Sequence, residues 1–144
     1  MKATIIISLF AVIFNISAFA GFNPVDAGEI ETVIKEYVGN TDTKNAKGLE
    51  AIIYDDASIV CVNKITNKVI SSDKDIFIDQ VKSGKIGGWK RDYKIESIDI
   101  NDETAMAKIT ITDSKLKQTE YLSFAKVEGE WKIVSRTYTI ELKK

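Results

Sequence analysis

The sequence predicts an α+β fold in which three N-terminal helices pack against a strongly bent, cone-shaped antiparallel sheet. In three segments before residue 84, apolar residues recur at three- and four-residue spacing, as they do along one face of a helix. From Gly87 onward the pattern changes to alternation, which is typical of strands with one buried face. Helices followed by a run of long strands must cover one face of the sheet, because each element has an apolar face to bury.

The first two helices are predicted before residue 55. The first is expected over residues 24–38, because Asn23 is a good N-cap residue, Pro24 suits the first helical position, and Gly39 follows the last apolar residue of the stripe. A second, shorter helix is expected over about residues 43–54.

A strand, a hairpin arm and a third helix are predicted next. Residues 58–63 form a short apolar run that suits a buried strand, and residues 69–71 are expected to pair back on it. Ser72 or Asp73 is expected to cap the third helix, and Gly84 is expected to close it.

The remaining chain is predicted to be strand. Alternation from Trp89 to Ile95 changes phase before Ile98, which predicts a β-bulge that bends the sheet. The strand over residues 104–112 has the most regular alternation. Two last strands are expected, over residues 117–127 and 130–141. A strongly curved sheet closed by helices leaves a cone, and we expect a cavity at its wide end.

Residues 1–20 are predicted to be a signal peptide. Lys2 precedes an apolar stretch, and Ala18 and Ala20 lie at the positions where a signal peptidase recognises small side chains. The apolar stretch is shorter than the roughly 20 residues of a membrane span. We therefore expect cleavage after Ala20, one mature domain over residues 21–144, a periplasmic or secreted location, and no membrane attachment after cleavage.

Composition excludes several classes of function. The formal net charge is −1 and charges of both signs are interspersed, so no basic stripe is available for nucleic acid. The chain has no histidine, which removes histidine triads, bases and metal ligands. Cys61 is the single cysteine and is expected to be a buried, inert thiol. Acids around residues 73–79 lack the glycine and glutamate of a calcium loop. We expect no metal and no cofactor.

Two phrases of the sequence carry a family resemblance. The helix that ends in LEAIIYDDA (49–57) and the closing phrase EYLSFAKVEGEWKIV (120–134) resemble the nuclear transport factor 2-like superfamily. The second phrase is similar to the SnoaL-like and putative lumazine-binding branches. The resemblance covers roughly residues 23–140 and implies a cystatin-like cone and, commonly, a homodimer. It does not imply one activity, because the superfamily includes isomerases, dehydratases, cyclases, binding modules and dimerisation domains.

The resemblance directs attention to acids that could act as a base. Ketosteroid isomerase-like members use a buried carboxylate with a tyrosine or a protonated acid as oxyanion donor. Glu120 shares its strand parity with Leu122 and Phe124, which predicts an inward carboxylate, and Asp113 is a second candidate. The alternative is an acid paired with Lys or Arg.

Aromatic side chains are the candidates for a ligand pocket. These are Tyr37, Phe77, Trp89, Tyr93, Tyr121 and Phe124. Each could instead fill the core. Ile133 and Val134 are apolar on opposite parities, which fits either a dimer interface across the sheet or a bulge.

The leading functional hypothesis is a non-catalytic binding or accessory protein that holds a small apolar or aromatic molecule in the cone. An isomerase- or cyclase-like enzyme with Glu120 or Asp113 as base is the first alternative. A ligand-free structural dimerisation domain is the second.

Overall fold

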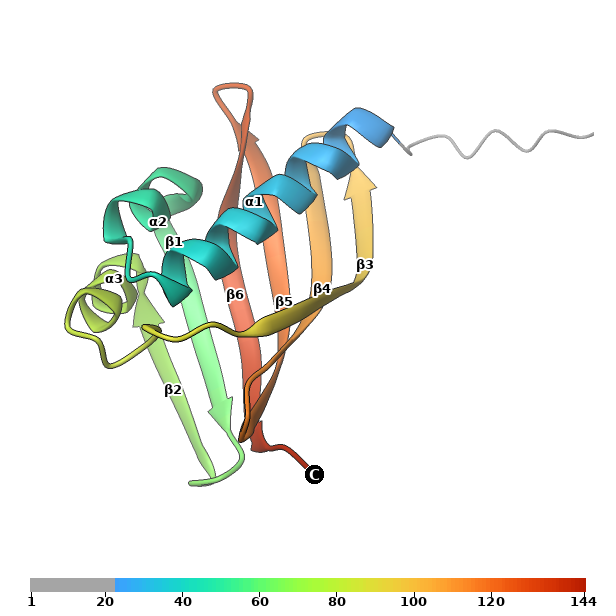
Figure 1. Cartoon of the computed structure of the whole chain (residues 1–144). Helices are drawn as coiled ribbons and strands as arrows, with labels where there is room; N and C mark the ends of the chain where they lie inside the picture. The colour runs from blue at the N-terminus through green and yellow to red at the C-terminus, as the bar shows by residue number, and fades with distance from the viewer. Residues whose placement is uncertain (1–22) are drawn as a thin grey trace, which may run out of the picture.

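Figure 1 shows the computed structural model, which describes residues 23–144. The elements in order are α1 (Pro24–Asp42), α2 (Ala46–Ile52), β1 (Ile53–Asn63), β2 (Lys68–Asp73), α3 (Lys74–Lys82), β3 (Asp92–Asn101), β4 (Thr104–Thr112), β5 (Leu116–Val127) and β6 (Glu130–Leu142). The predicted signal peptide lies outside the described residues. Among residues 23–144, none of the helices combines the length and apolar character needed to cross a membrane.

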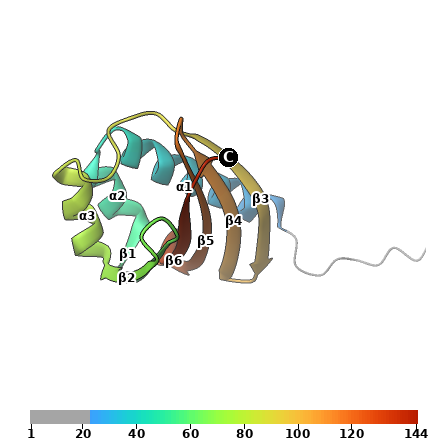
Figure 2. The same ribbon diagram turned by 90° about the horizontal axis from the view of Figure 1, so that it is seen from below.

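The predicted α+β architecture is confirmed: three helices pack against a curved six-stranded sheet. The strand order is β2-β1-β6-β5-β4-β3. All neighbours are antiparallel except β1 and β6, which pair in parallel. Figure 1 shows α1 running diagonally across the sheet, with α2 and α3 beside β1 and β2, and Figure 2 shows the strands curving around α1. The concave face is therefore the face that the helices cover.

Besides a register shift between Ile53 and Ser58 in the pairing of β1 with β6, two bulges interrupt the sheet. The register between β3 and β4 shifts between Ile95 and Ser97, as the change of phase in the sequence predicts, and Figure 1 shows β3 turning sharply along its length. The other bulge lies between β5 and β6, where Ser123 pairs with Ser135 but Phe124 pairs with Ile133. Val134 is therefore an extra residue in β6. This bulge accounts for the apolar residues on both parities of the last strand.

The boundaries of α1 and α2 differ from the predicted ones. Gly39 does not stop α1, which continues to Asp42. Glycine inside a helix costs only about 1 kcal/mol, and the extension buries Thr41, whose hydroxyl donates to the Tyr37 carbonyl. Asn45 caps α2 by accepting from the Gly48 amide, so α2 begins later than expected.

Two strand boundaries also differ from the predicted ones. β1 begins at Ile53, before the expected residue 58, because Ile53 pairs with Ile133 of β6. β3 begins at Asp92, so Trp89 belongs to the preceding connection rather than to a strand. The predicted hairpin arm is confirmed as part of β2, and the predicted cap of α3 is Asp73, which accepts from the Ile76 amide.

The core lies between the helices and the concave face. The four inward positions of β4 are buried as the alternation predicts: Ala105, Ala107, Ile109 and Ile111. The predicted burial of the Cys61 thiol on β1 is also confirmed. From the helices, Ile30, Tyr37 and Phe77 pack into the same cluster.

A buried carboxylate fastens the start of α1 to the sheet. Asp26 accepts hydrogen bonds from Lys126 Nζ of β5 and from Trp131 Nε1 of β6, the latter at 3.2 Å, and also from Asn23 Nδ2 at 2.7 Å. The hydrogen bond from Lys126 is the main cause that lowers the pKa of Asp26 below its ordinary value of 3.8, outweighing the opposite effect of burial. Folding therefore favours the ionised form of the Asp26 carboxyl group.

We expect stability to depend on the ionisation of Asp26 in acid. Because the folded-state pKa is depressed, its contribution is fully present above the unfolded value and is lost as pH falls through the folded value. The difference in free energy of unfolding between wild type and Asp26→Asn should therefore be largest near neutrality and shrink below about pH 4. Urea titrations at several pH values measure it. Asp102→Asn, on the exposed β3–β4 turn, is the control; equal pH dependence in both variants would contradict the assignment.

Candidate functional site

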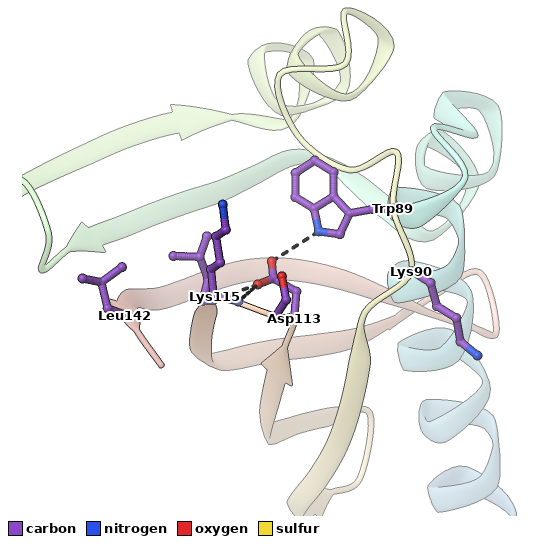
Figure 3. A pocket seen from close by; sticks show the side chains of 7 residues that line it. Trp89, Lys90, Asp113, Lys115 and Leu142 are labelled. Carbon is purple, nitrogen blue, oxygen red and sulfur yellow. Dashed lines mark hydrogen bonds between the residues drawn. The ribbon is translucent and has the colours of Figure 1, made fainter. Parts of the chain in front are cut away.

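An open pocket of about 580 Å³ lies at the end of the sheet where β4 turns into β5 and β6 finishes. We call it the end pocket, and Figure 3 shows it. Leu116 and Leu142, which are paired at the ends of β5 and β6, form its apolar part. By strand alternation they share the concave face with Glu120 and Tyr138, four residues further in. The end pocket is therefore the outer end of the helix-covered face.

Trp89 forms one wall of the end pocket. Trp89 is 47% exposed, and its Nε1 donates to Asp113 Oδ2 at 3.3 Å. Figure 3 shows this hydrogen bond as a dashed line. Asp113 Oδ1 accepts from the backbone amides of Lys115 and Leu116 at 2.7 and 2.8 Å. Burial alone would raise the pKa of Asp113, but these amides, the indole and the charge of Arg91 outweigh it and lower the pKa. Asp113 is thus a carboxylate that shapes the β4–β5 turn and orients the tryptophan.

The connection between α3 and β3 is anchored to the end of α1, and this fixes Trp89. The Gly88 amide donates to the Asp42 carbonyl at 3.0 Å, and the Arg91 amide donates to Asp42 Oδ2 at 2.9 Å. Gly87 has a φ of +77° and lies so close to Thr41 that a β-carbon there would sit 1.9 Å from the Thr41 carbonyl oxygen. Only glycine fits this approach.

Further in, a buried ion pair crosses from β5 to β6. Arg136 Nε and Nη2 donate to the two carboxylate oxygens of Glu120, each at 2.8 Å. Tyr37 Oη on α1 donates to Glu120 Oε2 at 2.9 Å. The prediction that Glu120 points inward is confirmed, and so is the alternative that it pairs with a basic residue. Three donors engage the carboxylate, which leaves it poorly placed to accept a proton from a substrate.

Aromatic rings enclose the Arg136 guanidinium. Its central carbon lies 3.5 Å from the ring centre of Tyr138, 5.3 Å from that of Phe77 and 5.5 Å from that of Tyr37. Burial lowers the pKa of Arg136, but the charge and hydrogen bonds of Glu120 outweigh this and raise it above its ordinary value. Burial also raises the pKa of Tyr37, and that of Tyr138 to about 12. Both phenols therefore stay protonated near neutral pH.

The six predicted pocket aromatics do not gather in one place. Tyr37 and Phe77 lie against Arg136, and Phe124 is buried on the concave face of β5. Trp89 lines the end pocket, and Tyr93 is 38% exposed on the edge strand β3. Tyr121 follows Glu120 and so lies on the opposite face, 45% exposed, with Lys108 Nζ 5.8 Å from its ring centre.

A family model matches residues 25–139 and is described as "Putative lumazine-binding". The chain belongs to this putative lumazine-binding family. Among solved structures, it is similar to an NTF2-like protein of unknown function from Silicibacter pomeroyi DSS-3, with 20% identity, coverage of 83% of this chain and 100% of that chain, and a TM-score of 0.73.

Two further solved structures have the same fold. An NTF2-like protein of unknown function from Shewanella baltica OS155 has 21% identity, coverage of 83% and 97%, and a TM-score of 0.73. A cystatin-like domain of unknown function from Nostoc punctiforme PCC 73102 has 12% identity, coverage of 85% and 81%, and a TM-score of 0.66. Comparison with curated proteins gives no match. The predicted superfamily and its putative lumazine-binding branch are confirmed.

The sequence reasoning missed the two arginines. Of the 20 basic residues in this member of the putative lumazine-binding family, only Arg91 and Arg136 are arginine. Both are buried and both are paired with an acid. The scarcity of arginine was visible in the sequence and could have marked them, because arginine suits buried ion pairs better than lysine.

Among residues 23–144 there is no group of three or more carboxylate and thiol side chains placed to hold a metal ion. The arrangement that the structure does offer is an open end pocket whose apolar and aromatic walls are Leu116, Leu142 and Trp89, with the Asp113 carboxylate beside the indole. This combination is typical of sites for small organic molecules.

Proposed function

We propose that this protein is a non-catalytic binding domain that holds a small planar aromatic molecule in the end pocket. The observation that carries the proposal is Trp89, whose half-exposed indole is fixed by Asp113 and by the anchored connection. A large flat side chain held in place next to apolar walls favours stacking of a ring on it. The volume of about 580 Å³ lies within the range of ordinary ligand sites, roughly 300–1,000 Å³.

The family description suggests a first probe. Lumazine is a planar two-ring heterocycle with two carbonyl groups, and its flat faces suit the indole. Acetophenone, a single ring with one carbonyl group, is a smaller second probe.

Two indole N–H signals report on the proposed function, because the chain has two tryptophans. Trp89 lies in the end pocket, whereas Trp131 is only 4% exposed and bonds to Asp26. We expect lumazine or acetophenone to shift the Trp89 indole signal in a ¹⁵N correlation spectrum and to leave that of Trp131 unchanged. Trp89→Phe assigns the signals, and Trp89→Ala should weaken binding roughly tenfold. The proposal would be overturned if ligand at millimolar concentration shifted neither indole signal, or shifted only the signal of Trp131.

A second candidate is an isomerase- or cyclase-like enzyme. The observation in its favour is the hydrogen bond from Tyr37 Oη to Glu120 Oε2, because a buried tyrosine and carboxylate make up the pair that such chemistry uses. The bidentate contact of Arg136 argues against it, since the base would have to give up these bonds before it accepts a proton. Deuterium exchange from the carbon next to the carbonyl of acetophenone tests it: exchange abolished by Glu120→Gln would favour the enzyme.

We propose in addition that the protein is exported and forms a homodimer. The proposals rest on the pattern of residues 1–20 and on the superfamily resemblance. An N-terminus at Gly21 in protein recovered from outside the cytoplasm would support export. An N-terminus at Met1 would contradict it. Light scattering of the purified protein distinguishes a dimer from a monomer.

A further inference from the structure

The end pocket lies at a basic end of the molecule. The β1–β2 turn, the β4–β5 turn and the end of β6 share this end of the sheet, because β1 runs parallel to β6 and β5 starts opposite the end of β6. Six lysines lie in or beside these segments: Lys64, Lys68, Lys115, Lys117, Lys143 and Lys144. The turns at the opposite end of the sheet carry acids instead: Asp102, Glu103 and Glu128. The fold therefore separates charges that are mixed along the sequence.

The acids at the basic end do not cancel its charge. Glu141 forms ion pairs with two of the six lysines, at 3.1 and 3.8 Å. Asp113 accepts hydrogen bonds from two backbone amides and from the Trp89 indole. At the start of β3, Lys90 and Asp92 offset each other. An excess of positive charge therefore remains around the end pocket, and such a field attracts anions.

Lys115 brings part of this positive charge into the lining of the end pocket. Its amide donates to Asp113 Oδ1 at 2.7 Å, and its carbonyl oxygen accepts from the Lys143 amide at 2.8 Å. These two bonds hold the backbone from which the side chain extends. Figure 3 shows the Lys115 side chain on the same side of the turn as the Trp89 indole, whereas that of Lys90 points away. In the described part of the chain, Lys115 forms no ion pair, so its ammonium group is available to a ligand.

We propose that the end pocket binds an aromatic carboxylate, with the ring stacked on Trp89 and the carboxylate group on the Lys115 ammonium. This inference rests on the proposed function of the end pocket and adds the charge of the ligand. Leu116 and Leu142 supply the apolar part that a ring needs beside the indole. A carboxylate accepts charge-assisted hydrogen bonds from an ammonium group, and these are stronger than neutral ones.

A cationic ligand is disfavoured at the same place. The one carboxylate in the lining of the end pocket is that of Asp113, and three donors already bond to its oxygens. A cation would therefore find no free acceptor there and would be repelled by the surrounding lysines.

The experiment compares three planar probes of the same shape and different charge: benzoate, benzamide and benzamidine. Each is titrated into the purified protein at low ionic strength, and Kd is read from the Trp89 indole signal. We expect benzoate to bind about three- to fivefold more tightly than benzamide, which is the range for an exposed ion pair, and benzamidine to bind most weakly. The preference for benzoate should fall towards one in 0.5 M salt, because salt screens exposed charges.

Lys115→Gln tests the residue that carries the inference. The preference for benzoate over benzamide should fall towards one in this variant, and an unshifted Trp131 indole signal shows that the variant folds. The matched control is Lys35→Gln, at an exposed lysine of α1 that does not line the end pocket. It removes the same charge from the protein and should keep the full preference.

The outcomes separate this inference from the proposed function. Equal binding of benzoate and benzamide to the wild type would overturn the inference and leave the end pocket as a site for neutral rings. Benzamidine as the tightest probe would overturn it as well. An equal loss of preference in Lys35→Gln would show that net charge, and not Lys115, attracts the carboxylate. If no probe shifted the Trp89 signal, both the inference and the proposed function would be wrong.

Discussion

Replacing Glu120 by alanine is expected to lower the free energy of unfolding by about 3–5 kcal/mol, the usual cost of breaking a buried ion pair from one side. Glu120 is completely buried and accepts two hydrogen bonds from Arg136 and one from the Tyr37 hydroxyl. Its removal leaves a guanidinium without a counter-charge among aromatic rings, together with an unpaired phenol. Urea unfolding followed by circular dichroism measures the change, compared at constant m-value.

A double variant separates the loss of charge balance from the loss of contacts. Glu120→Leu with Arg136→Met removes both charges and keeps most of the volume. Because apolar residues often replace buried ion pairs with little loss, we expect the double variant to lie within about 1–2 kcal/mol of wild type. A double variant as unstable as Glu120→Ala would contradict the assignment, because the damage would then come from packing.

Gly87→Ala is expected to cost about 1–3 kcal/mol of stability for the strained backbone alone, and more because of a steric clash. Its φ of +77° disfavours any side chain, and the new β-carbon would meet the Thr41 carbonyl oxygen at 1.9 Å. Backbone atoms cannot rotate away as a side chain can, so the connection must move off α1. Trp89 lies two residues further on, and we expect its indole N–H signal to shift as the bond to Asp113 weakens.

Gly129→Ala is the matched control for this effect. Gly129 has a similar φ of +83°, but nothing lies within 4 Å of a β-carbon built there. The two variants therefore share the backbone strain and differ in the contact with Thr41. Thermal unfolding should show Gly87→Ala to be the less stable of the two. Equal melting temperatures, with the Trp89 signal unmoved, would show that the connection is not held at this point.

Local patterns in the sequence are sufficient to predict much of the fold. The alternation from residue 104 to residue 112 predicts the buried face of β4, and the change of phase before Ile98 predicts the bulge in β3. Parity places Glu120 on the inner face. These features depend on neighbours within a few residues, which is the range over which side-chain periodicity holds.

Contacts between distant residues could not be predicted in this way. Arg136 reaches Glu120 diagonally across β5 and β6, since the register pairs Arg136 with Leu122. Arg91 bonds to Asp42, which is 49 positions away in sequence. The same limit explains the helix boundaries, because Gly39 remains helical owing to tertiary burial of Thr41. Trp89 was expected on a strand and instead stands on a connection that is held by α1, again through partners far away in the chain.

The position of β6 determines the order in which the chain can fold. β6 is the last strand in sequence but lies inside the sheet, between β1 and β5. The strands β3 to β6 are joined by short turns and can assemble locally, whereas β1 must wait for β6 before it gains a parallel neighbour. Such long-range closure is slow compared with hairpin formation. The sheet therefore cannot be completed until β6 has been synthesised, and a chain cut before β6 would leave β1 and β2 separated from the rest of the sheet.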